Sequence, residues 1–211
     1  IEFMERSALL SFEELGRLAS VLAQMGVDRI RLTGGEPTVR KGVVELVEHL
    51  ALARAHGLRD LAMTTNGWNL ESLAAPLRAA GLDRLNISLD TLDRERFVRL
   101  TRTDRLGDVL AGIDAVTALG WESLKLNVVL CRGENEHEAC DFVERFADQA
   151  VTIRFIEYMP FGASRFELVP WAEVQERLEA RWRLRPIDGP PGSGPATYWQ
   201  VEGTRVRVGA I

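Results

Sequence analysis

Amphipathic segments with helical spacing alternate along the chain with short runs of apolar residues. Each amphipathic segment carries apolar residues three or four positions apart, and a glycine commonly separates it from the run that follows. Strands are predicted over five such runs, at residues 28–33, 61–64, 84–89, 124–130 and 151–157. A helix before each strand, repeated in this way, is typical of a parallel sheet, built either as a barrel or as a doubly wound layer.

The helices are predicted from their apolar positions and from the glycines that end them. In the first helix, Ser11 and Glu14 have the spacing of a capping box, and an apolar stripe runs up to Gly26. This stripe consists of Leu15, Leu18, Leu22 and Met25. The later helices have apolar residues at positions 43, 44, 47 and 50; 70, 73 and 77; 106, 110, 113 and 116; and 142, 143 and 146. Three of them are expected to end in a left-handed glycine cap, at Gly57, Gly81 and Gly120.

Polar and apolar residues alternate within the predicted strands. Arg31 lies between Ile30 and Leu32, and the same alternation recurs over residues 85–89 and 124–128. Strands of a doubly wound sheet are covered on both faces and are expected to be apolar throughout. The alternation therefore favours a barrel with helices outside and a polar interior, although one polar residue at the wet end of each strand would give a similar pattern. We predict an α/β fold, an incomplete, open parallel β/α barrel of the TIM type, because fewer than eight βα units are present.

The pattern changes towards the C-terminal end of the chain. A helix is predicted first, with apolar residues Trp171, Val174, Leu178 and Trp182. A Gly/Pro-rich loop follows at residues 189–195, and two strand-like runs at 197–202 and 204–209 predict a hairpin. Residues 1–170 are therefore predicted to form the partial barrel, and residues 171–211 a small C-terminal appendage of helix and hairpin.

Composition limits the class of protein. The 211 residues include 46% hydrophobic and 27% charged residues, as in an ordinary globular protein. The net charge of −5 argues against a general nucleic-acid binder, and no apolar run reaches the roughly 20 residues that a membrane span needs. The two cysteines, Cys131 and Cys140, have no C-x-x-C spacing. A cytoplasmic protein is therefore expected.

Polar residues gather where the predicted strands end. Thr33-Gly34-Gly35-Glu36-Pro37 follows the first strand, and its two glycines let backbone N–H groups approach a ligand closely. The later strands contain or continue into the segments Thr64-Thr65-Asn66-Gly67, Asn86-Ile87-Ser88-Leu89-Asp90, Lys125-Leu126-Asn127 and Arg154-Phe155-Ile156-Glu157-Tyr158-Met159-Pro160. Barrel enzymes build their active sites at the carboxyl ends of the strands, so an active site is predicted there.

These segments resemble the radical S-adenosylmethionine (SAM) superfamily, and more closely the GTP 3′,8-cyclase (MoaA) family of molybdenum-cofactor biosynthesis. The Gly-Gly-Glu-Pro segment marks the superfamily, whereas the segments that begin at Lys125 and Arg154 resemble the narrower family. The similarity extends from about Leu10 to the end of the chain. The resemblance implies a lyase that converts GTP to (8S)-3′,8-cyclo-7,8-dihydroguanosine 5′-triphosphate, in the first step of molybdenum-cofactor (molybdopterin) biosynthesis.

The resemblance also implies two sets of ligand-binding residues. The cofactor SAM would be bound by Gly34, Gly35, Glu36, Pro37, Ser88 and Met159. The substrate GTP would be bound by Arg31, Thr64, Lys125 and Arg154. Arginine and lysine suit this division because they are the usual partners of phosphate groups. The alternative for Arg31 and Lys125 is an internal ion pair with Glu36 or Glu157.

The sequence departs from the family in its cysteines. The family binds two [4Fe–4S] clusters, one through an N-terminal C-x-x-x-C-x-x-C loop and one through three cysteines near the C-terminus. Cys131 and Cys140 match neither motif, so no catalytic or metal-binding residue is assigned, and the chain by itself is expected to be inactive. Because the chain begins at Ile1 and not at methionine, we expect it to start after the first cysteine loop and to end before the second.

Two rival functions remain open. One is another radical SAM branch, for instance one that acts on peptides, and the other is a nucleotide-binding barrel module without clusters. Binding of GTP and not of peptide would favour the cyclase. Besides GTP, the resemblance implies an electron donor as a partner and leaves a homodimer open, whereas neither a nucleic acid nor a membrane is expected.

Overall fold

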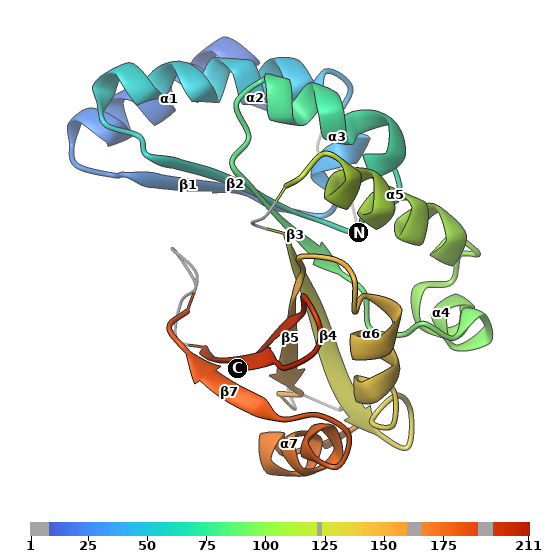
Figure 1. Cartoon of the computed structure of the whole chain (residues 1–211). Helices are drawn as coiled ribbons and strands as arrows, with labels where there is room; N and C mark the ends of the chain where they lie inside the picture. The colour runs from blue at the N-terminus through green and yellow to red at the C-terminus, as the bar shows by residue number, and fades with distance from the viewer. Residues whose placement is uncertain (1–8, 122–123, 160–165, 190–195) are drawn as a thin grey trace. The chain divides into compact units, whose positions relative to one another are not determined.

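The computed structural model describes residues 9–121, 124–159, 166–189 and 196–211 (Figure 1). Pro160 and residues 190–195 of the predicted Gly/Pro-rich loop lie outside the described residues. The chain divides into two compact units, each taken by itself below: the part up to Thr65 together with residues 72–85, and residues 66–71 together with 86–211. The domain boundary predicted after residue 170 stays a prediction.

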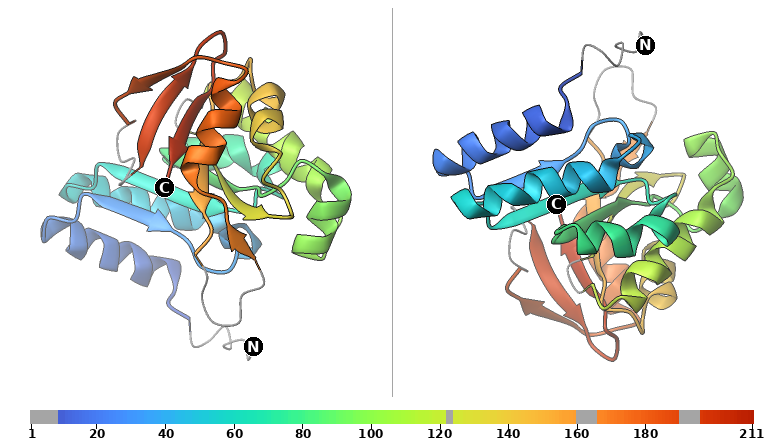
Figure 2. Two further views of the ribbon diagram at one scale, coloured as in Figure 1. Left: turned by 90° about the horizontal axis from the view of Figure 1, so that it is seen from below. Right: turned by 90° about the horizontal axis from the view of Figure 1, so that it is seen from above.

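The first unit is a pair of parallel strands with helices packed on it. Its elements are α1 (Phe12–Gln24), β1 (Arg29–Leu32), the 3-10 helix η2 (Pro37–Val39), α2 (Val43–Ala51), the 3-10 helix η3 (Leu52–His56), β2 (Asp60–Thr65), most of α3 (Leu70–Ala79) and the start of β3 (Arg84–Ser88). Arg29 of β1 pairs with Asp60 of β2, and the parallel register runs on to Leu32 and Met63. Helices α1 and α2 lie side by side along these strands (Figures 1 and 2).

Local sequence signals set the ends of these helices as predicted. The Ser11 hydroxyl accepts a hydrogen bond from the Glu14 N–H at 3.2 Å, and the Glu14 carboxylate accepts from the Ser11 N–H at 2.7 Å. The predicted capping box is therefore confirmed. Gly26, Gly57 and Gly81 have φ values of +100°, +116° and +103°, the left-handed conformation that ends a helix.

The buried face of α1 differs from the predicted apolar stripe. The helix buries Gly16, Ala19 and Ala23, whereas the stripe residues Leu18 and Met25 are 47% and 77% exposed. A Cβ on Gly16 would lie 3.1 Å from the backbone oxygen of a residue in α2, so small side chains let the two helices approach closely. Leu15 and Leu22 of the stripe are half-buried, so the prediction was wrong for Leu18 and Met25, where close helix contact favours the small residues instead.

Two carboxylates tie together the beginnings of β2 and β3 in the first unit. The Asp60 carboxylate accepts a hydrogen bond from Nε of Arg84 at 2.6 Å, in a pair that is largely buried. The Asp83 carboxylate accepts from the Leu61 N–H and from Nη2 of Arg54, both at 2.7 Å. These charge-assisted bonds fix the amino ends of the strands, opposite the ends that carry the predicted site.

The second unit extends a parallel sheet with an antiparallel tail. Its elements are the end of β3, α4 (Arg94–Thr101), α5 (Leu106–Ala118), β4 (Lys125–Arg132), α6 (Ala139–Arg145), β5 (Thr152–Glu157), β6 (Glu167–Leu168), α7 (Trp171–Glu179), β7 (Leu184–Ile187), β8 (Thr197–Val201) and β9 (Arg207–Ala210). Strands β3, β4, β5 and β9 pair in parallel in that order, and β8 and β7 follow as antiparallel neighbours. Helices α6 and α7, yellow and orange in Figure 2, lie side by side.

The predicted hairpin forms, but it is part of the main sheet. Strands β8 and β9 pair antiparallel, as predicted, and β9 also pairs in parallel with β5 through Thr152 and Arg207. Helix α4 and strand β7 were not predicted. Helix α4 begins at the N-cap Asp93, whose carboxylate accepts a hydrogen bond from the Arg96 N–H at 2.7 Å.

The alternation within the strands holds in the second unit. The apolar residues Ile87, Leu89, Leu124, Leu126 and Val128 are at most 1% exposed. The opposite side of these strands, here called the polar face, carries Asn86, Ser88, Lys125, Asn127, Thr152 and Arg154. A sheet with one apolar and one polar face therefore lies in this unit, as the sequence predicts.

We expect the fit of α5 against the turn at Gly67 to depend on Gly112. A Cβ on Gly112 would lie 2.7 Å from the Gly67 carbonyl oxygen and 2.9 Å from Cβ of Leu70. Gly112→Ala should therefore lower the free energy of unfolding by about 1–3 kcal/mol, as overpacking does. Gly107→Ala is the control in the same helix, because a Cβ there meets nothing within 4 Å, and it should change stability by less than about 1 kcal/mol. Urea unfolding of both variants tests this, and equal losses would contradict it.

Candidate functional site

In the first unit, the Gly-Gly turn follows β1 directly and is open on its outer side. Gly34 has a φ of +140°, a value that favours glycine, whereas Gly35 has no such backbone requirement. A Cβ at either position would meet nothing within 4 Å. Arg31 lies on β1 and is exposed. The backbone at Gly34 and Gly35 therefore borders a space that no side chain of the described residues fills.

Glu36 ties this turn to the end of β2. Its Oε1 accepts hydrogen bonds from the Thr38 N–H at 2.9 Å, the Thr38 hydroxyl at 2.6 Å and the Thr65 hydroxyl at 2.7 Å. The alternative of an internal ion pair for Arg31, with Glu36 or Glu157, stays a prediction. Thr64, predicted to bind GTP, is half-buried beside Thr65. Glu36 thus holds the turn after β1 against the strand that carries Thr64.

In the second unit, the strand register sets the predicted residues in rows across the polar face. Ser88 pairs with Asn127, and Asn127 pairs with Arg154, so these three form one row. Asn86, Lys125 and Thr152 form the next row, two residues earlier along the strands. Lys125 therefore opens β4 and does not lie at its carboxyl end, where the sequence pattern placed it.

Both cations of the polar face are buried. Lys125 is 2% exposed and Arg154 is 7% exposed. The Arg154 guanidinium donates from Nε and Nη2 to Oδ1 of Asn127, at 2.8 Å and 2.5 Å. Burying a cation is costly unless it meets hydrogen-bond acceptors or an anion, so this face is built around charge.

Glu157 is the last residue of β5, and Met159 follows two residues later. Met159 is 63% exposed. The Glu157 carboxylate accepts a hydrogen bond from the Trp171 N–H at 2.8 Å and so anchors the first turn of α7. In α7 the indole of Trp171 stacks on Trp199 with ring centroids 4.8 Å apart. The segment that carries Met159 is thus fixed at its start by α7 and β8.

The loops after β3 and β4 are joined by polar side chains that sequence reasoning missed. Asn135 donates from Nδ2 to the carbonyl oxygens of Asp90 and Val129, and its Oδ1 accepts from the Cys131 N–H at 2.7 Å. Burial raises the pKa of the Asp90 carboxyl, which accepts a hydrogen bond from the Val129 N–H. These bonds fix the strand end that carries Ser88, two residues before Asp90.

Glu138 completes this connection from the start of α6. It is 3% exposed, and its carboxylate accepts from the Thr91 hydroxyl at 2.7 Å and from the Leu92 N–H at 2.6 Å. Arg96 forms an ion pair with the same carboxylate. The polar run around residue 135 was the available sequence signal, but its spacing does not indicate which loop it contacts.

The cysteines do not fit an iron–sulfur site. Burial raises the pKa of Cys131 to about 11, with added effects of Asp90, Glu134 and Glu136, and burial also raises the pKa of Cys140. Their spacing in the sequence also matches neither cysteine motif of the family. Among the described residues, no group of three or more His, Cys, Asp or Glu side chains is placed to hold a metal ion.

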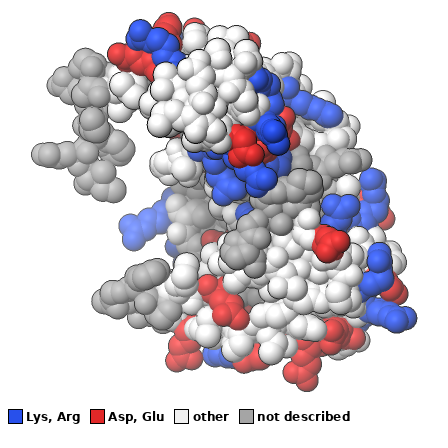
Figure 3. All heavy atoms as spheres, turned by 90° about the vertical axis from the view of Figure 1, so that its left-hand side faces the viewer, with Lys and Arg blue, Asp and Glu red and all other residues white. Residues whose placement is uncertain are grey.

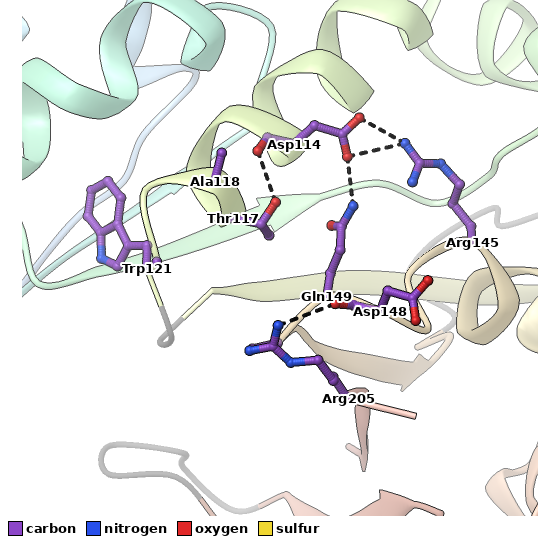
Figure 4. A pocket seen from close by; sticks show the side chains of 10 residues that line it. Asp114, Thr117, Ala118, Trp121, Arg145, Asp148, Gln149 and Arg205 are labelled. Carbon is purple, nitrogen blue, oxygen red and sulfur yellow. Dashed lines mark hydrogen bonds and ion pairs between the residues drawn. The ribbon is translucent and has the colours of Figure 1, made fainter. Parts of the chain in front are cut away.

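A separate cavity of about 490 Å³ lies beside the beginnings of β4 and β5 (Figure 4). The Asp114 carboxylate in its wall accepts from Nη2 of Arg145 at 3.0 Å and from Nε2 of Gln149 at 2.8 Å. Asp148 and Arg205 are the other charged residues described in the lining, so positive and negative charges balance.

Basic and acidic side chains also occur together on the face drawn in Figure 3. None of the described helices is long and apolar enough to cross a membrane.

The predicted ligand sets are divided between the two units. Gly34, Gly35, Glu36 and Pro37 of the SAM set belong to the first unit, and Ser88 and Met159 belong to the second. For the GTP set, Arg31 and Thr64 belong to the first unit, and Lys125 and Arg154 to the second. Each of the two units therefore carries some of the predicted ligand-binding residues on or just after its parallel strands.

This chain belongs to the radical SAM superfamily, whose family model matches residues 2–146. It is 47% identical over 216 residues to the GTP 3′,8-cyclase of Ectopseudomonas mendocina (strain ymp), with all of this chain and 64% of that protein covered. It is 42% identical over 214 residues to the GTP 3′,8-cyclase of Marinobacter nauticus, covering 99% of this chain and 64% of that protein. The chain thus spans a little under two thirds of the length of these curated relatives.

Solved structures share the fold at low sequence identity. A radical SAM methyltransferase from Sphaerobacter thermophilus has a TM-score of 0.62 at 17% identity, covering 81% of this chain and 54% of that one. A domain of a pyruvate-formate lyase-activating enzyme from Bacteroides vulgatus has a TM-score of 0.58 at 16% identity, covering 71% of this chain and 90% of that one. The predicted fold class, an incomplete parallel β/α barrel of the TIM type, is confirmed.

We expect the turn after β1 to depend on the Glu36 carboxylate. Glu36→Ala removes the acceptor of three hydrogen bonds and should destabilise the protein by about 1–3 kcal/mol. The Thr38 amide should then exchange faster with deuterium. Glu36→Gln keeps an acceptor oxygen and should lose less, and Glu48→Ala, at an exposed position of α2, should lose almost nothing. Unfolding and hydrogen-exchange measurements check this, and unchanged exchange at Thr38 would refute it.

Proposed function

We propose that this chain is the central part of a GTP 3′,8-cyclase, the radical SAM lyase that makes (8S)-3′,8-cyclo-7,8-dihydroguanosine 5′-triphosphate from GTP in molybdenum-cofactor biosynthesis. Relatives named GTP 3′,8-cyclase, at 42–47% identity over nearly the whole chain, support this proposal. The structural observation that carries it is the burial of Lys125 and Arg154 on one polar sheet face. Two cations on one face suit a polyanionic substrate.

On the cofactor side, the residues of the Gly-Gly turn fit SAM. The open space at Gly34 and Gly35 leaves backbone groups accessible to the polar end of a ligand. Glu36 holds the turn, Pro37 begins the 3-10 helix behind it, and Ser88 ends β3. Met159 is the proposed contact for the adenine. When bound, SAM supplies the radical chemistry, and the chain positions the reactants and excludes water.

On the substrate side, Arg31, Thr64, Lys125 and Arg154 are proposed to bind GTP. Each of the four lies on a strand, and rigid strands hold charged groups more firmly than loops do. Lys125 supplies an ammonium point charge, whereas Arg154 supplies a planar guanidinium that can bind two oxygens at once. These two cations together suit a triphosphate, which carries acceptor oxygens on three successive phosphate groups.

The two [4Fe–4S] clusters of the family need ligands other than Cys131 and Cys140. We therefore propose that the 211 residues alone have no cyclase activity, whatever their affinity for SAM or GTP. An electron donor, a cytoplasmic location and a homodimer stay predictions.

Gly35→Val should block SAM binding and leave the fold intact. The chain has room for a side chain at this position, so only a ligand in that space would exclude valine. Isothermal titration calorimetry with SAM, on this chain and on the full reading frame where that is longer, should show affinity lost at an unchanged melting temperature. Gly107→Val at another open glycine is the control. Unchanged SAM affinity in Gly35→Val would remove Gly35 from the site.

Lys125→Ala should lower the affinity for GTP by roughly ten- to a hundredfold. The lost contact is charge-assisted and worth about 1.5–3 kcal/mol. The affinity for SAM should change little, because the SAM residues lie on other strands. Lys41→Ala removes an exposed lysine and is the matched control for general electrostatic attraction. A variant with a lower melting temperature but intact GTP affinity would assign Lys125 to internal pairing instead.

A further inference from the structure

Arg154 is held on the polar face by a hydrogen bond acceptor from the neighbouring strand. Asn127 of β4 pairs in register with Arg154 of β5, and its Oδ1 accepts from both Nε and Nη2 of the guanidinium. Two bonds to one oxygen fix the plane of the guanidinium and the edge formed by Nε and Nη2. The opposite edge, which carries Nη1, then has a direction set by Asn127.

Gly209 of β9 makes room on the other side of Arg154. It pairs in register with Arg154 on one flank and with Tyr198 of β8 on the other. A Cβ on Gly209 would lie 2.7 Å from Cε1 of Tyr198 and 3.4 Å from Cγ of Arg154. The Tyr198 side chain is only 1% exposed, so its ring cannot move aside freely. A side chain at residue 209 would therefore displace the ring, the arginine stem or both.

We propose that Asn127 and Gly209 are positioning residues for Arg154, which direct its guanidinium towards the triphosphate of a nucleotide. Asn127 fixes the guanidinium from β4. Gly209 of β9 has no side chain, so it leaves room for the aliphatic part of the Arg154 side chain and for the Tyr198 ring of β8. This inference rests on the proposed function, because it takes GTP as the ligand of Arg154. Neither residue needs to touch the substrate.

The choice of an amide over a carboxylate at residue 127 supports this role. Aspartate would hold the guanidinium at least as firmly, since an ion pair adds charge to the same hydrogen bonds. It would also cancel the positive charge that an anionic ligand needs. Asparagine supplies the acceptor oxygen and adds no negative charge, so the pair of Asn127 and Arg154 stays cationic. A residue that served packing alone would not distinguish these two side chains.

A double-mutant cycle on the 211-residue chain tests the inference with inorganic triphosphate and GTP as probes. Arg154→Ala should weaken binding of both probes by roughly ten- to a hundredfold, and Asn127→Ala by roughly tenfold. The double variant should be no more than about twofold weaker than Arg154→Ala alone, because Asn127 acts only through Arg154. Gln175→Ala is the control, since it removes an amide from the outer surface of α7.

Asn127→Asp tests the need for a neutral acceptor separately from stability. It keeps the acceptor and the fold, so its melting temperature should equal or exceed that of the parent chain, while triphosphate binding should still fall by roughly tenfold. Gly209→Ala should also weaken binding, by roughly three- to tenfold, and its effect should likewise vanish in the Arg154→Ala background. Because Gly209→Ala acts on the Arg154 side chain from β9, the test of positioning stands even if Asn127→Ala unfolds.

The outcomes distinguish this inference from the proposed function. If Arg154→Ala binds both probes as the parent chain does, the substrate role of Arg154 and the inference fail together. If Arg154→Ala weakens binding but neither Asn127→Ala nor Gly209→Ala does, only the positioning role is overturned. Additive losses in the cycle would likewise overturn it, because they would show that Asn127 acts independently of Arg154.

Discussion

The burial of two cations on one face of a parallel sheet governs the structure of the second unit. Lys125 and Arg154 are almost fully enclosed, and a buried charge costs more than the surrounding apolar contacts gain unless acceptors surround it. The strands meet this requirement by alternation: every second residue packs against helices, so the residues between them can be polar. The strand register sets three polar residues beside the cations: Asn86, Asn127 and Thr152. The same alternation gives the unit an apolar core and a charged interior face.

The sequence predicts those parts of the fold that depend on local signals. The capping box at Ser11, the left-handed glycines and the strand alternation each involve residues close together in the chain, and each is confirmed. The buried face of α1 was predicted only in part. It depends on how closely another helix approaches, which the stripe of apolar residues does not indicate. Strand β9 illustrates the same limit: its hairpin with β8 is local, but its pairing with β5 spans some fifty residues.

The candidate site divides in the same way. Gly35, Ser88 and Arg154 could be nominated because they stand in recognisable segments after or within predicted strands. Asn127 stands in such a segment too, yet the role we propose for it depends on the register between β4 and β5, which no local pattern gives. Asn135 and Glu138 were missed for a related reason. They act on a loop more than forty residues away, where they hold the end of β3. Motifs thus name the groups near a ligand, whereas the residues that position them emerge from tertiary contacts.

Glycines in this chain stand in two opposite physical settings, and the difference bears on the proposed function. Gly112 and Gly209 are hemmed in by neighbouring atoms, so the fold itself excludes a side chain at each position. Gly35 has open space around it and an ordinary φ, so nothing in the described part of the chain accounts for glycine there. The proposed function predicts that a ligand in this space makes glycine necessary at residue 35. In a chain of the radical SAM superfamily, at a turn that Glu36 fixes to the next strand, we propose that this ligand is the polar end of the cofactor.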